Sequence, residues 1–240
     1  MFFGKKKAVT FSYDDAVTQD IHLINLLDRY GLKCTFNLNS GLLGKEGMLI
    51  RENQRIAHYK ILPERVREIY EGHEVAVHTV HHPSLINLSD EEIVREVEED
   101  RVALESLVGY EVVGMAYPNG SHVVDSRVER VLKEQTAVRY SRGTDCSHDF
   151  TMPDNLYHFK PTVYHLDFDL MMELGEKFLA SESDEPQLFY IWGHAYEMDY
   201  DSLHWHRLEE FFKLISGRDD VYYGTNTEVL LGYDNRKNRR

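Results

Sequence analysis

The sequence has little of what marks several common classes of protein. It contains only two cysteines, Cys34 and Cys146, in no CxxC pattern, so nothing indicates a disulfide framework. It has no glycine-rich phosphate or dinucleotide loop, which argues against a Rossmann-type cofactor site. No apolar run near the N-terminus has the length of a signal-peptide core or a transmembrane helix. We therefore expect a soluble, cytoplasmic protein, the alternative being that a leader peptide has been removed.

Positive charge is also in short supply. With 27 lysines and arginines against 41 aspartates and glutamates, the formal net charge is −14. Such a chain is not expected to bind nucleic acid or an anionic membrane. The negative balance favours a neutral or cationic substrate, although net charge does not determine the charge of a local pocket. The 240 residues are 42% hydrophobic with no low-complexity run, which predicts one globular domain over residues 1–240.

Strand patterns alternate with helix patterns along the whole chain. From Lys7 to Tyr13 the side chains alternate between two faces, which predicts a strand that leads directly into Asp14 and Asp15. Further strands are predicted at 34–38, 74–78, 112–117, 137–140, 188–192 and 221–223. Helices are predicted at 18–31, 63–70, 89–109, 128–132, 168–179, 203–215 and 229–231, with a loop at 41–47 and irregular chain at 141–156.

This alternation predicts an α/β architecture built on a parallel sheet. Polar residues follow the C-terminal ends of many different strands: Asp14, Asp15, Asn37, Asn39, His78, Pro118, Asn119, Arg142 and His194. Barrels of parallel strands collect their active sites in this way, so we expect a barrel rather than an open doubly wound sheet.

The segment His78-Thr79-Val80-His81-His82-Pro83 is the first candidate for chemistry. It ends a short apolar strand, and Pro83 disfavours a helix there because it restricts the backbone of His82. His78 and His82 can converge on one divalent metal ion, for which neutral imidazole is a common ligand. A third ligand has to come from elsewhere in the chain, and a catalytic metal also needs an open position for water.

Asp14 and Asp15 are candidates for that third ligand. Because they are adjacent at a strand end, their side chains point in different directions and can do different jobs. One carboxylate can complete a site with the two histidines, while the other accepts a proton from water. The residues alone do not decide which aspartate takes which role.

Four motifs together resemble those of the polysaccharide deacetylases, the NodB-homology or carbohydrate esterase family 4-like group. Ser12-Tyr13-Asp14-Asp15-Ala16 is similar to the first motif, Thr-Phe-Asp-Asp-Gly, and residues 78–83 match the second, His-Ser/Thr-x-x-His-Pro. Tyr117-Pro118-Asn119-Gly120 resembles a degenerate third motif, and Trp192-Gly193-His194 resembles the last one. The motifs fall in the family's order, and the resemblance covers nearly the whole chain.

The resemblance implies a distorted (β/α)7-type barrel. It also implies that Asp15, His78 and His82 bind one divalent metal ion, which we expect to be zinc, with cobalt, nickel or manganese as alternatives. Asp14 would be the catalytic base and His194 the acid. The implied reaction is metal-dependent hydrolysis that removes acetyl groups from an amino sugar or carbohydrate, as an N- or O-deacetylase. The expected partner is then an acetylated carbohydrate or a small-molecule substrate.

The sequence departs from the family pattern at two catalytic positions. Ala116 stands where the third motif has an arginine that orients the base, and we predict that Arg142 fills this role and pairs with Asp14. The usual fourth motif is absent, so the carboxylate partner of the acid is not identified, and Asp145 and Glu197 are both candidates.

Several further expectations concern single residues. Pro118, Asn119 and Trp192 are predicted to bind substrate, and His81 is expected to point away from the metal. The dense acidic residues of the helix at 89–109 are interpreted as a solvated face. The remaining histidines singled out are expected at the surface rather than in a site: His22, His58, His73, His148, His158 and His165.

Two other functions remain open at this point. The first is hydrolysis of another non-peptide C–N bond, such as that of a cyclic amide or a formamide, by the same architecture. The second is a non-catalytic carbohydrate-binding relative, which the missing third-motif arginine suggests. Asp14 and His194 argue against the second alternative, because a binding module needs neither a base nor an acid.

Overall fold

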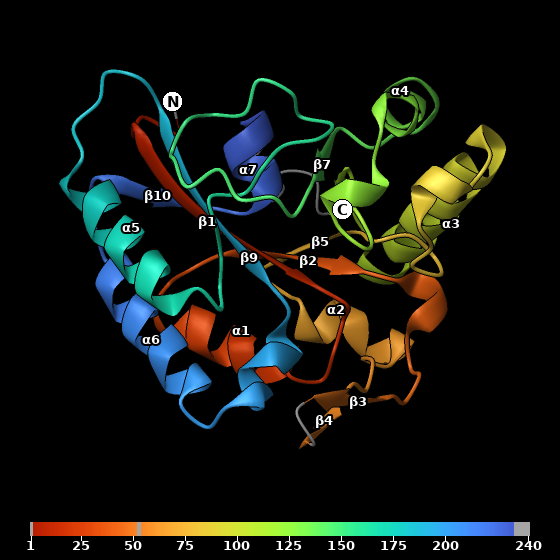
Figure 1. Cartoon of the computed structure of the whole chain (residues 1–240), viewed down its shortest axis with the longest axis horizontal. Helices are drawn as coiled ribbons and strands as arrows, with labels where there is room; N and C mark the ends of the chain where they lie inside the picture. Colours follow the sequence, from red (N-terminus) through yellow and green to blue (C-terminus); the bar gives the residue numbers. More distant parts are fainter. Residues whose placement is uncertain (1, 52–53, 233–240) are drawn as a thin grey trace.

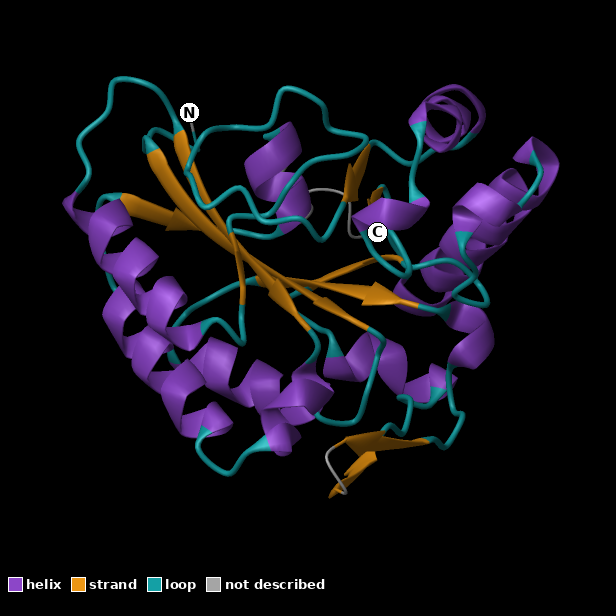
Figure 2. Cartoon of the chain, viewed as in Figure 1, coloured by secondary structure: helices purple, strands orange, loops and turns teal. Residues whose placement is uncertain are grey.

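A curled sheet of parallel strands forms the centre of the molecule, and helices cover its outside (Figures 1 and 2). The structure is a computed structural model that describes residues 2–51 and 54–232. The strands of this sheet are β1 (Lys7–Asp14), β2 (Cys34–Leu38), β5 (Glu74–Val77), β6 (Gly114–Ala116), β7 (Tyr140–Arg142), β8 (Val163–Tyr164), β9 (Gln187–Gly193) and β10 (Val221–Tyr223). They follow the order β7-β6-β5-β2-β1-β9-β8, with β10 paired to β1.

Strand β1 is the central strand of the sheet. It pairs with β9 along one edge and with β10 and then β2 along the other, always in parallel. All eight of its residues are buried, although the alternating pattern of 7–13 would suit a strand with one exposed face. Burial on both faces is typical of parallel strands that are covered on each side.

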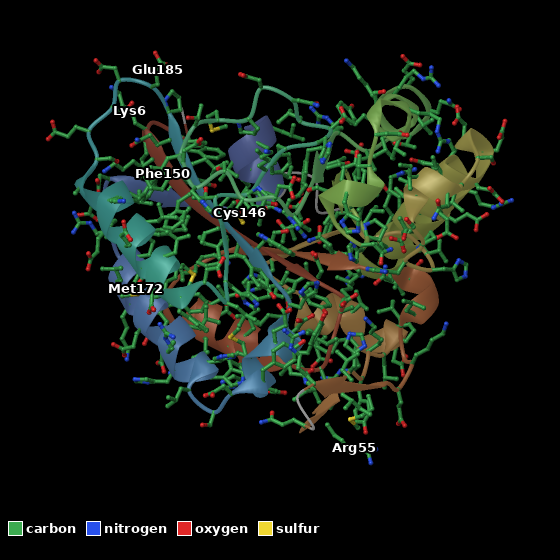
Figure 3. All side chains as sticks on the ribbon, viewed as in Figure 1. Lys6, Arg55, Cys146, Phe150, Met172 and Glu185 are labelled. Carbon is green, nitrogen blue, oxygen red and sulfur yellow. The ribbon has the colours of Figure 1, made fainter. Side chains whose placement is uncertain are left out.

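The helices form layers on the outside of the sheet. Helices α5 and α6 pack against each other, and α3 packs on α4 and β5 (Figure 1). Their bounds are α1 (Asp20–Arg29), α2 (Val66–Ile69), α3 (Asp90–Val108), α4 (Ser126–Gln135), α5 (Phe168–Ala180), α6 (His204–Ile215) and α7 (Asn226–Leu231). Short 3-10 helices lie at η1 (Ser40–Leu42), η2 (Pro63–Arg65), η3 (Leu85–Asn87), η4 (Ser121–Val123) and η5 (Ala195–Tyr200). Side chains fill the space between these layers (Figure 3).

This architecture confirms the predicted α/β class and the distorted barrel of parallel strands. The extent of the expected single domain stays a prediction, because residue 1, residues 52–53 and residues 233–240 lie outside the described part of the chain. Among the described residues, no helix combines the length and apolar character needed to cross a membrane.

Some predicted element boundaries are wrong. The strand predicted at 137–140 is displaced to β7, and the helix predicted at 63–70 divides into η2 and α2. Strand β8 was not predicted because two residues are too short to show a period.

The largest omission is an antiparallel hairpin of β3 (Met48–Arg51) and β4 (Gln54–Ala57), which forms a separate sheet below α2 in the view of Figure 1. Most of its side chains are exposed, so its sequence lacks the apolar alternation of a half-buried strand.

Candidate active site

The site begins where β1 ends. Asp14 is the last residue of the strand, and Asp15 then turns the chain with a φ of 89°, followed by Ala16 at 52°. Positive φ values are uncommon outside glycine, and they cluster where the surrounding structure forces them. The turn sends the two carboxylates to different neighbours, as expected for two aspartates that do different jobs.

Asp15, His78 and His82 lie together. One ligand atom from each can be chosen so that all three lie within 4.8 Å of one another, which makes them a candidate metal triad. The Nδ1–H of His78 donates to the carbonyl of Ala116 at 2.8 Å, so its Nε2 keeps a lone pair for a metal ion. The rings of His78 and His82 meet at 71° with 4.8 Å between their centres. This donor set suits zinc or a related divalent ion.

The protonation states of the triad suit a metal ion as well. Burial lowers the pKa of His78 to about 4 and also lowers the pKa of His82. Burial alone would raise the pKa of Asp15, but the hydrogen bond to His58 and the charge of Lys60 hold it well below its usual value. Two neutral imidazoles and one carboxylate are therefore ready to ligate near neutral pH without losing a proton.

The loop that carries the two histidines is held by helix α3. The buried carboxylate of Asp100 accepts hydrogen bonds from the backbone N–H of His78 at 3.0 Å and of Ser40 at 2.6 Å. One turn earlier, Glu96 accepts from the N–H and the ring Nδ1 of His81 at 2.9 and 2.8 Å. His81 thus points to Glu96 and away from the triad, as expected.

Two asparagines hold the carbonyl groups of the same loop. Asn39 donates from Nδ2 to the carbonyls of His78 and Thr79 at 2.5 and 3.0 Å, and Asn119 donates to the carbonyl of His82 at 3.2 Å. Thr79 and His82 have positive φ values of 68° and 58°. These bonds maintain a loop conformation that non-glycine residues rarely adopt.

The interpretation of the α3 acids as a solvated face is wrong for Asp100. Its side chain is fully buried, and with Ile93, Val97 and Leu104 it falls on the buried stripe of the helix. The sequence did contain a signal for this, since Asp100 falls among the apolar residues of the helical period. A carboxylate buried at such a position needs hydrogen-bond donors nearby.

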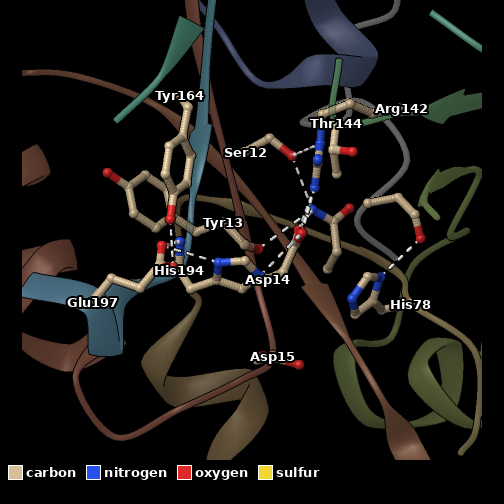
Figure 4. A network of polar contacts seen from close by, with 12 residues as sticks. Ser12, Tyr13, Asp14, Asp15, His78, Arg142, Thr144, Tyr164, His194 and Glu197 are labelled. Carbon is tan, nitrogen blue, oxygen red and sulfur yellow. Dashed lines mark hydrogen bonds and ion pairs between the residues drawn. The ribbon is translucent and has the colours of Figure 1, made fainter. Parts of the chain in front are cut away.

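Asp14 lies at the centre of a second group of polar contacts (Figure 4). The Nη2 of Arg142 donates to both of its carboxylate oxygens, at 2.5 and 2.6 Å, and the arginine is fully buried. Asn37 donates to the same carboxylate at 2.8 Å. Burial alone would raise the pKa of Asp14, but Arg142 and the nearby histidines lower it, so the carboxylate is ionised at neutral pH. The structure thus has the predicted contact between Arg142 and Asp14.

His194 faces Asp14 from the end of β9. Its Nε2 lies 3.9 Å from Oδ2 of Asp14, and its Nδ1 donates to the carboxylate of Glu197 at 3.0 Å. Burial alone would lower the pKa of His194, but the charge and hydrogen bond of Glu197 raise it to about 9. Asp145 and Glu197 were the two candidates for the carboxylate partner of His194. In the structure it is Glu197, three residues further along the chain, that contacts the His194 ring.

Glu197 is itself held by two further residues that the sequence did not identify. His165 donates to it from Nε2 at 2.8 Å and contacts the hydroxyl of Tyr13 through Nδ1 at 3.0 Å, and Tyr164 also donates to it. The expectation that His165 lies at the surface is wrong, because this residue is fully buried. The same expectation is wrong for His73, which is almost completely buried. The signal was weak, since His165 follows a strand of only two residues.

His58 and Lys60 also lie at the site rather than at a distance from it. His58 Nε2 is 3.4 Å from the carboxylate of Asp15, and Lys60 Nζ is 3.3 Å from it while donating to the Asp15 carbonyl at 2.7 Å. Both residues follow β4, whose hairpin was not predicted, so the sequence did not indicate their position.

A cavity of about 390 Å³ opens over these groups. Its lining combines the aspartates and histidines with uncharged and aromatic residues: Asp14, Asp15, His78, His82, Tyr117, Asn119, Gly120, Thr144, Trp192, His194 and Tyr196. Asn119 and Trp192 thus lie where substrate binding was predicted, whereas Pro118 is buried and does not line this cavity. Their role in binding stays a prediction.

A family profile described as polysaccharide deacetylase matches residues 4–139, which is more than half of the 240 residues. The chain belongs to the polysaccharide deacetylase family. A search of curated protein sequences finds no match.

Several solved structures share the fold of this family member. A putative polysaccharide deacetylase from Mycobacterium smegmatis is 18% identical with a TM-score of 0.66, and the match covers 98% of this chain and 91% of that one. A family 4 carbohydrate esterase from Streptomyces lividans, in complex with acetate, is 14% identical with a TM-score of 0.57, covering 92% and 93%. The deacetylase PplD from Streptococcus pyogenes is 18% identical with a TM-score of 0.55, covering 66% of this chain and 65% of its own.

Another structural neighbour is a mutant of a family 4 pseudoenzyme, which is 18% identical to this chain with a TM-score of 0.57, covering 94% of this chain and 67% of that one. Membership of the polysaccharide deacetylase family therefore does not by itself establish activity, and the roles of the site residues have to be tested individually.

The first test concerns the metal triad. Replacing His78 with Ala should abolish stoichiometric binding of zinc, because it removes a buried ligand whose ring orientation is already set. His81→Ala is the matched control, since His81 is the exposed histidine of the same loop and should leave the metal content unchanged. Elemental analysis after dialysis measures both, and full metal content in the His78 variant would disprove the site.

The second test concerns the hold of helix α3 on the histidine loop. Asp100→Asn keeps the side-chain size but presents an amide group to two backbone donors, so we expect zinc affinity to fall about tenfold or more. Glu99→Gln, at the exposed neighbouring position, should have no effect. Competition with a chromophoric chelator measures both dissociation constants, and equal affinities would show that α3 does not position the ligands.

The third test concerns the pairing of His194 with Glu197. Glu197→Gln removes the charge that favours the imidazolium while burial remains, so the pKa of His194 should fall from about 9 by roughly 1 unit or more. NMR titration of the His194 ring in the metal-free protein measures this pKa. Asp199→Asn, on the same 3-10 helix, should leave the pKa of His194 unchanged. An unchanged His194 pKa in both variants would contradict the pairing of His194 with Glu197.

Proposed function

We propose that this protein is a metal-dependent deacetylase that removes acetyl groups from an amino sugar or another carbohydrate. The observation that carries the proposal is the position of Asp14, which lies between the buried guanidinium of Arg142 and the imidazole of His194, beside the candidate metal triad (Figure 4). This arrangement provides a base, an acid and a metal site around one cavity. The family membership of the chain supports the same reaction class.

Asp15, His78 and His82 would hold the divalent ion, which we expect to be zinc. When bound, such an ion supplies Lewis-acid activation of water and of the acetyl carbonyl. The chain's own contribution to this step is two neutral imidazoles and one carboxylate, leaving coordination positions for water and substrate. The identity of the ion among zinc, cobalt, nickel and manganese follows from metal availability as well as from the donor set.

Asp14 would act as the base of the reaction. Its carboxylate is ionised at neutral pH because Arg142 lowers its pKa, so it can accept a proton from the attacking water. Arg142 also fixes the orientation of the carboxylate through two hydrogen bonds from one nitrogen. Arg142 would fill the role left vacant at Ala116, and its contact with Asp14 argues against a non-catalytic relative.

His194 would act as the acid on the leaving-group side. With its pKa raised to about 9, it is doubly protonated at neutral pH. Nδ1–H is engaged by Glu197, so Nε2–H is the proton that it can donate to the leaving nitrogen or oxygen. Asn119, Trp192 and Tyr196 surround the space in which a sugar ring would lie.

The alternative reaction on another non-peptide C–N bond uses the same three functions of metal, base and acid. A screen of the zinc-loaded protein against acetylated sugars, acetylated xylan and cyclic amides distinguishes the two. Released acetate is the readout for the acetylated substrates, and the ring-opened product, detected by mass spectrometry, is the readout for the cyclic amides. The cytoplasmic location expected from the sequence also stays a prediction.

The sharpest test of the mechanism is His194→Ala. Because an amide nitrogen leaves only when protonated, we expect deacetylation of an N-acetyl sugar to slow about a hundredfold or more. The rate of hydrolysis of an activated acetyl ester, whose leaving group needs little protonation, should fall much less. The variant should also keep its zinc content. Equal losses on the amide and the ester, or loss of zinc, would assign His194 to structure or ligation instead.

A further inference from the structure

A second cavity adjoins the active site on the side of the hairpin. It has a volume of about 340 Å³ and lies between the metal triad and the two arms that extend the hairpin, residues 44–47 and 58–61. We call it the hairpin chamber. It shares Asp15, His82 and Tyr196 with the active-site cavity, so the two cavities are neighbours.

The backbone bonds of the hairpin continue from β3 and β4 into this chamber. The N–H of His58 donates to the carbonyl of Gly47, and the N–H of Lys60 donates to the carbonyl of Lys45, both at 2.9 Å. The second arm is also bonded to the chain after Asp15, because Lys60 pairs with Val17 in an antiparallel bridge. The hairpin is therefore attached directly to the segment that carries a metal ligand.

This pairing puts like charges across from each other. Lys45 and Lys60 are joined by a backbone bond between the two arms, and both line the chamber. Like charges opposite each other on paired strands are destabilising unless an anion lies between or beside them. Lys60 has Asp15 as its partner at 3.3 Å, whereas the ammonium of Lys45 has no hydrogen bond or ion pair among the described residues.

Two carboxylates line the chamber together with these lysines, those of Asp15 and Glu46. Glu46 is exposed and forms no ion pair within 4.0 Å with either lysine. Asp15 is already shared between Lys60 and the metal site, and His58 lies 3.4 Å from it on the same arm. Lys45 is exposed whereas Lys60 is buried, and both line a cavity next to the candidate metal triad.

The chamber has room for a group of several atoms. Gly47 lies across from His58 and contributes no side chain, and a β-carbon placed there would lie 3.0 Å from the His58 carbonyl. An acetyl methyl group alone would leave most of a 340 Å³ space unfilled.

From these observations we infer that the hairpin chamber is a subsite for an anionic group of the substrate, a carboxylate or a phosphate. This inference rests on the proposed deacetylase function, since it makes the substrate an acetylated sugar that also carries negative charge. Lys45 is the specificity residue, and its free ammonium pairs with the anionic oxygens while Lys60 supports the same charge from the opposite arm. This proposal departs from the neutral or cationic substrate that the net charge of the chain favours.

The test compares three probes that share one N-acetyl sugar ring: neutral N-acetylglucosamine, N-acetylglucosamine 6-phosphate, and N-acetylmuramic acid, which carries a carboxylate. Their dissociation constants are measured by calorimetry on the Asp14→Asn full chain with zinc added, so that binding is read without turnover. The chamber variant is Lys45→Met, and the control is Lys6→Met. Lys6 precedes β1 and lies far from the labelled hairpin residue Arg55 (Figure 3).

We expect at least one anionic probe to bind about tenfold more tightly than the neutral sugar. The probe that binds more tightly shows whether the subsite takes a phosphate or a carboxylate. Lys45→Met should remove this preference and leave the neutral sugar unaffected, and raising the salt concentration to about 1 M should also reduce it. Lys6→Met should change nothing. Equal affinity for all three probes, or equal effects of the two lysine variants, would overturn the subsite.

The proposed function is tested separately by acetate release from neutral N-acetylglucosamine oligomers with the unmodified chain. Acetate release without a preference for the anionic probes would leave the deacetylase and reject the subsite. A preference for the anionic probes without acetate release would support the subsite and reject the deacetylase.

Discussion

The buried ion pair of Arg142 and Asp14 is the interaction on which the site depends. Moving two charges from water to the interior of a protein is costly, and only close contact and further hydrogen bonds offset that cost. Here the guanidinium also donates to Ser12 and the Gly143 carbonyl, and it lies 4.9 Å from the ring centre of Trp192. The ends of β1, β7 and β9 have to meet correctly for this pair to form. The same meeting brings Nε2 of His194 to 3.9 Å from the Asp14 carboxylate.

Much of this arrangement follows from the sequence because parallel strands bring their C-terminal ends together. Asp15, His78 and His82 could be placed near one another from their positions after β1 and β5. The contact of Arg142 with Asp14 could be predicted for the same reason, even though the arginine comes from a different strand than in the family motif. The fold class likewise follows from the alternation of strand and helix patterns.

The remaining features depend on contacts that no local pattern shows. Asp100 reaches the histidine loop across the packing of α3 on β5, and a charged residue on a helix is usually interpreted as solvated. Tyr164 ends a strand too short for a recognisable period and His165 follows it directly, yet both hold Glu197. The hairpin has exposed side chains, so its role in bringing Lys60 to Asp15 becomes visible only in three dimensions.

The central place of β1 also affects how the chain completes its site during synthesis. Its partner β2 follows within the first forty residues, whereas β9 and β10 come from the last third of the chain. The three candidate metal ligands have all been synthesised by residue 82, but the guanidinium comes at residue 142 and the imidazole of His194 later still. Pairings between distant segments form slowly, because a long loop has to close first. A growing chain therefore contains Asp14 and the three candidate metal ligands well before it contains Arg142 and His194, the two residues that face Asp14 in the folded protein.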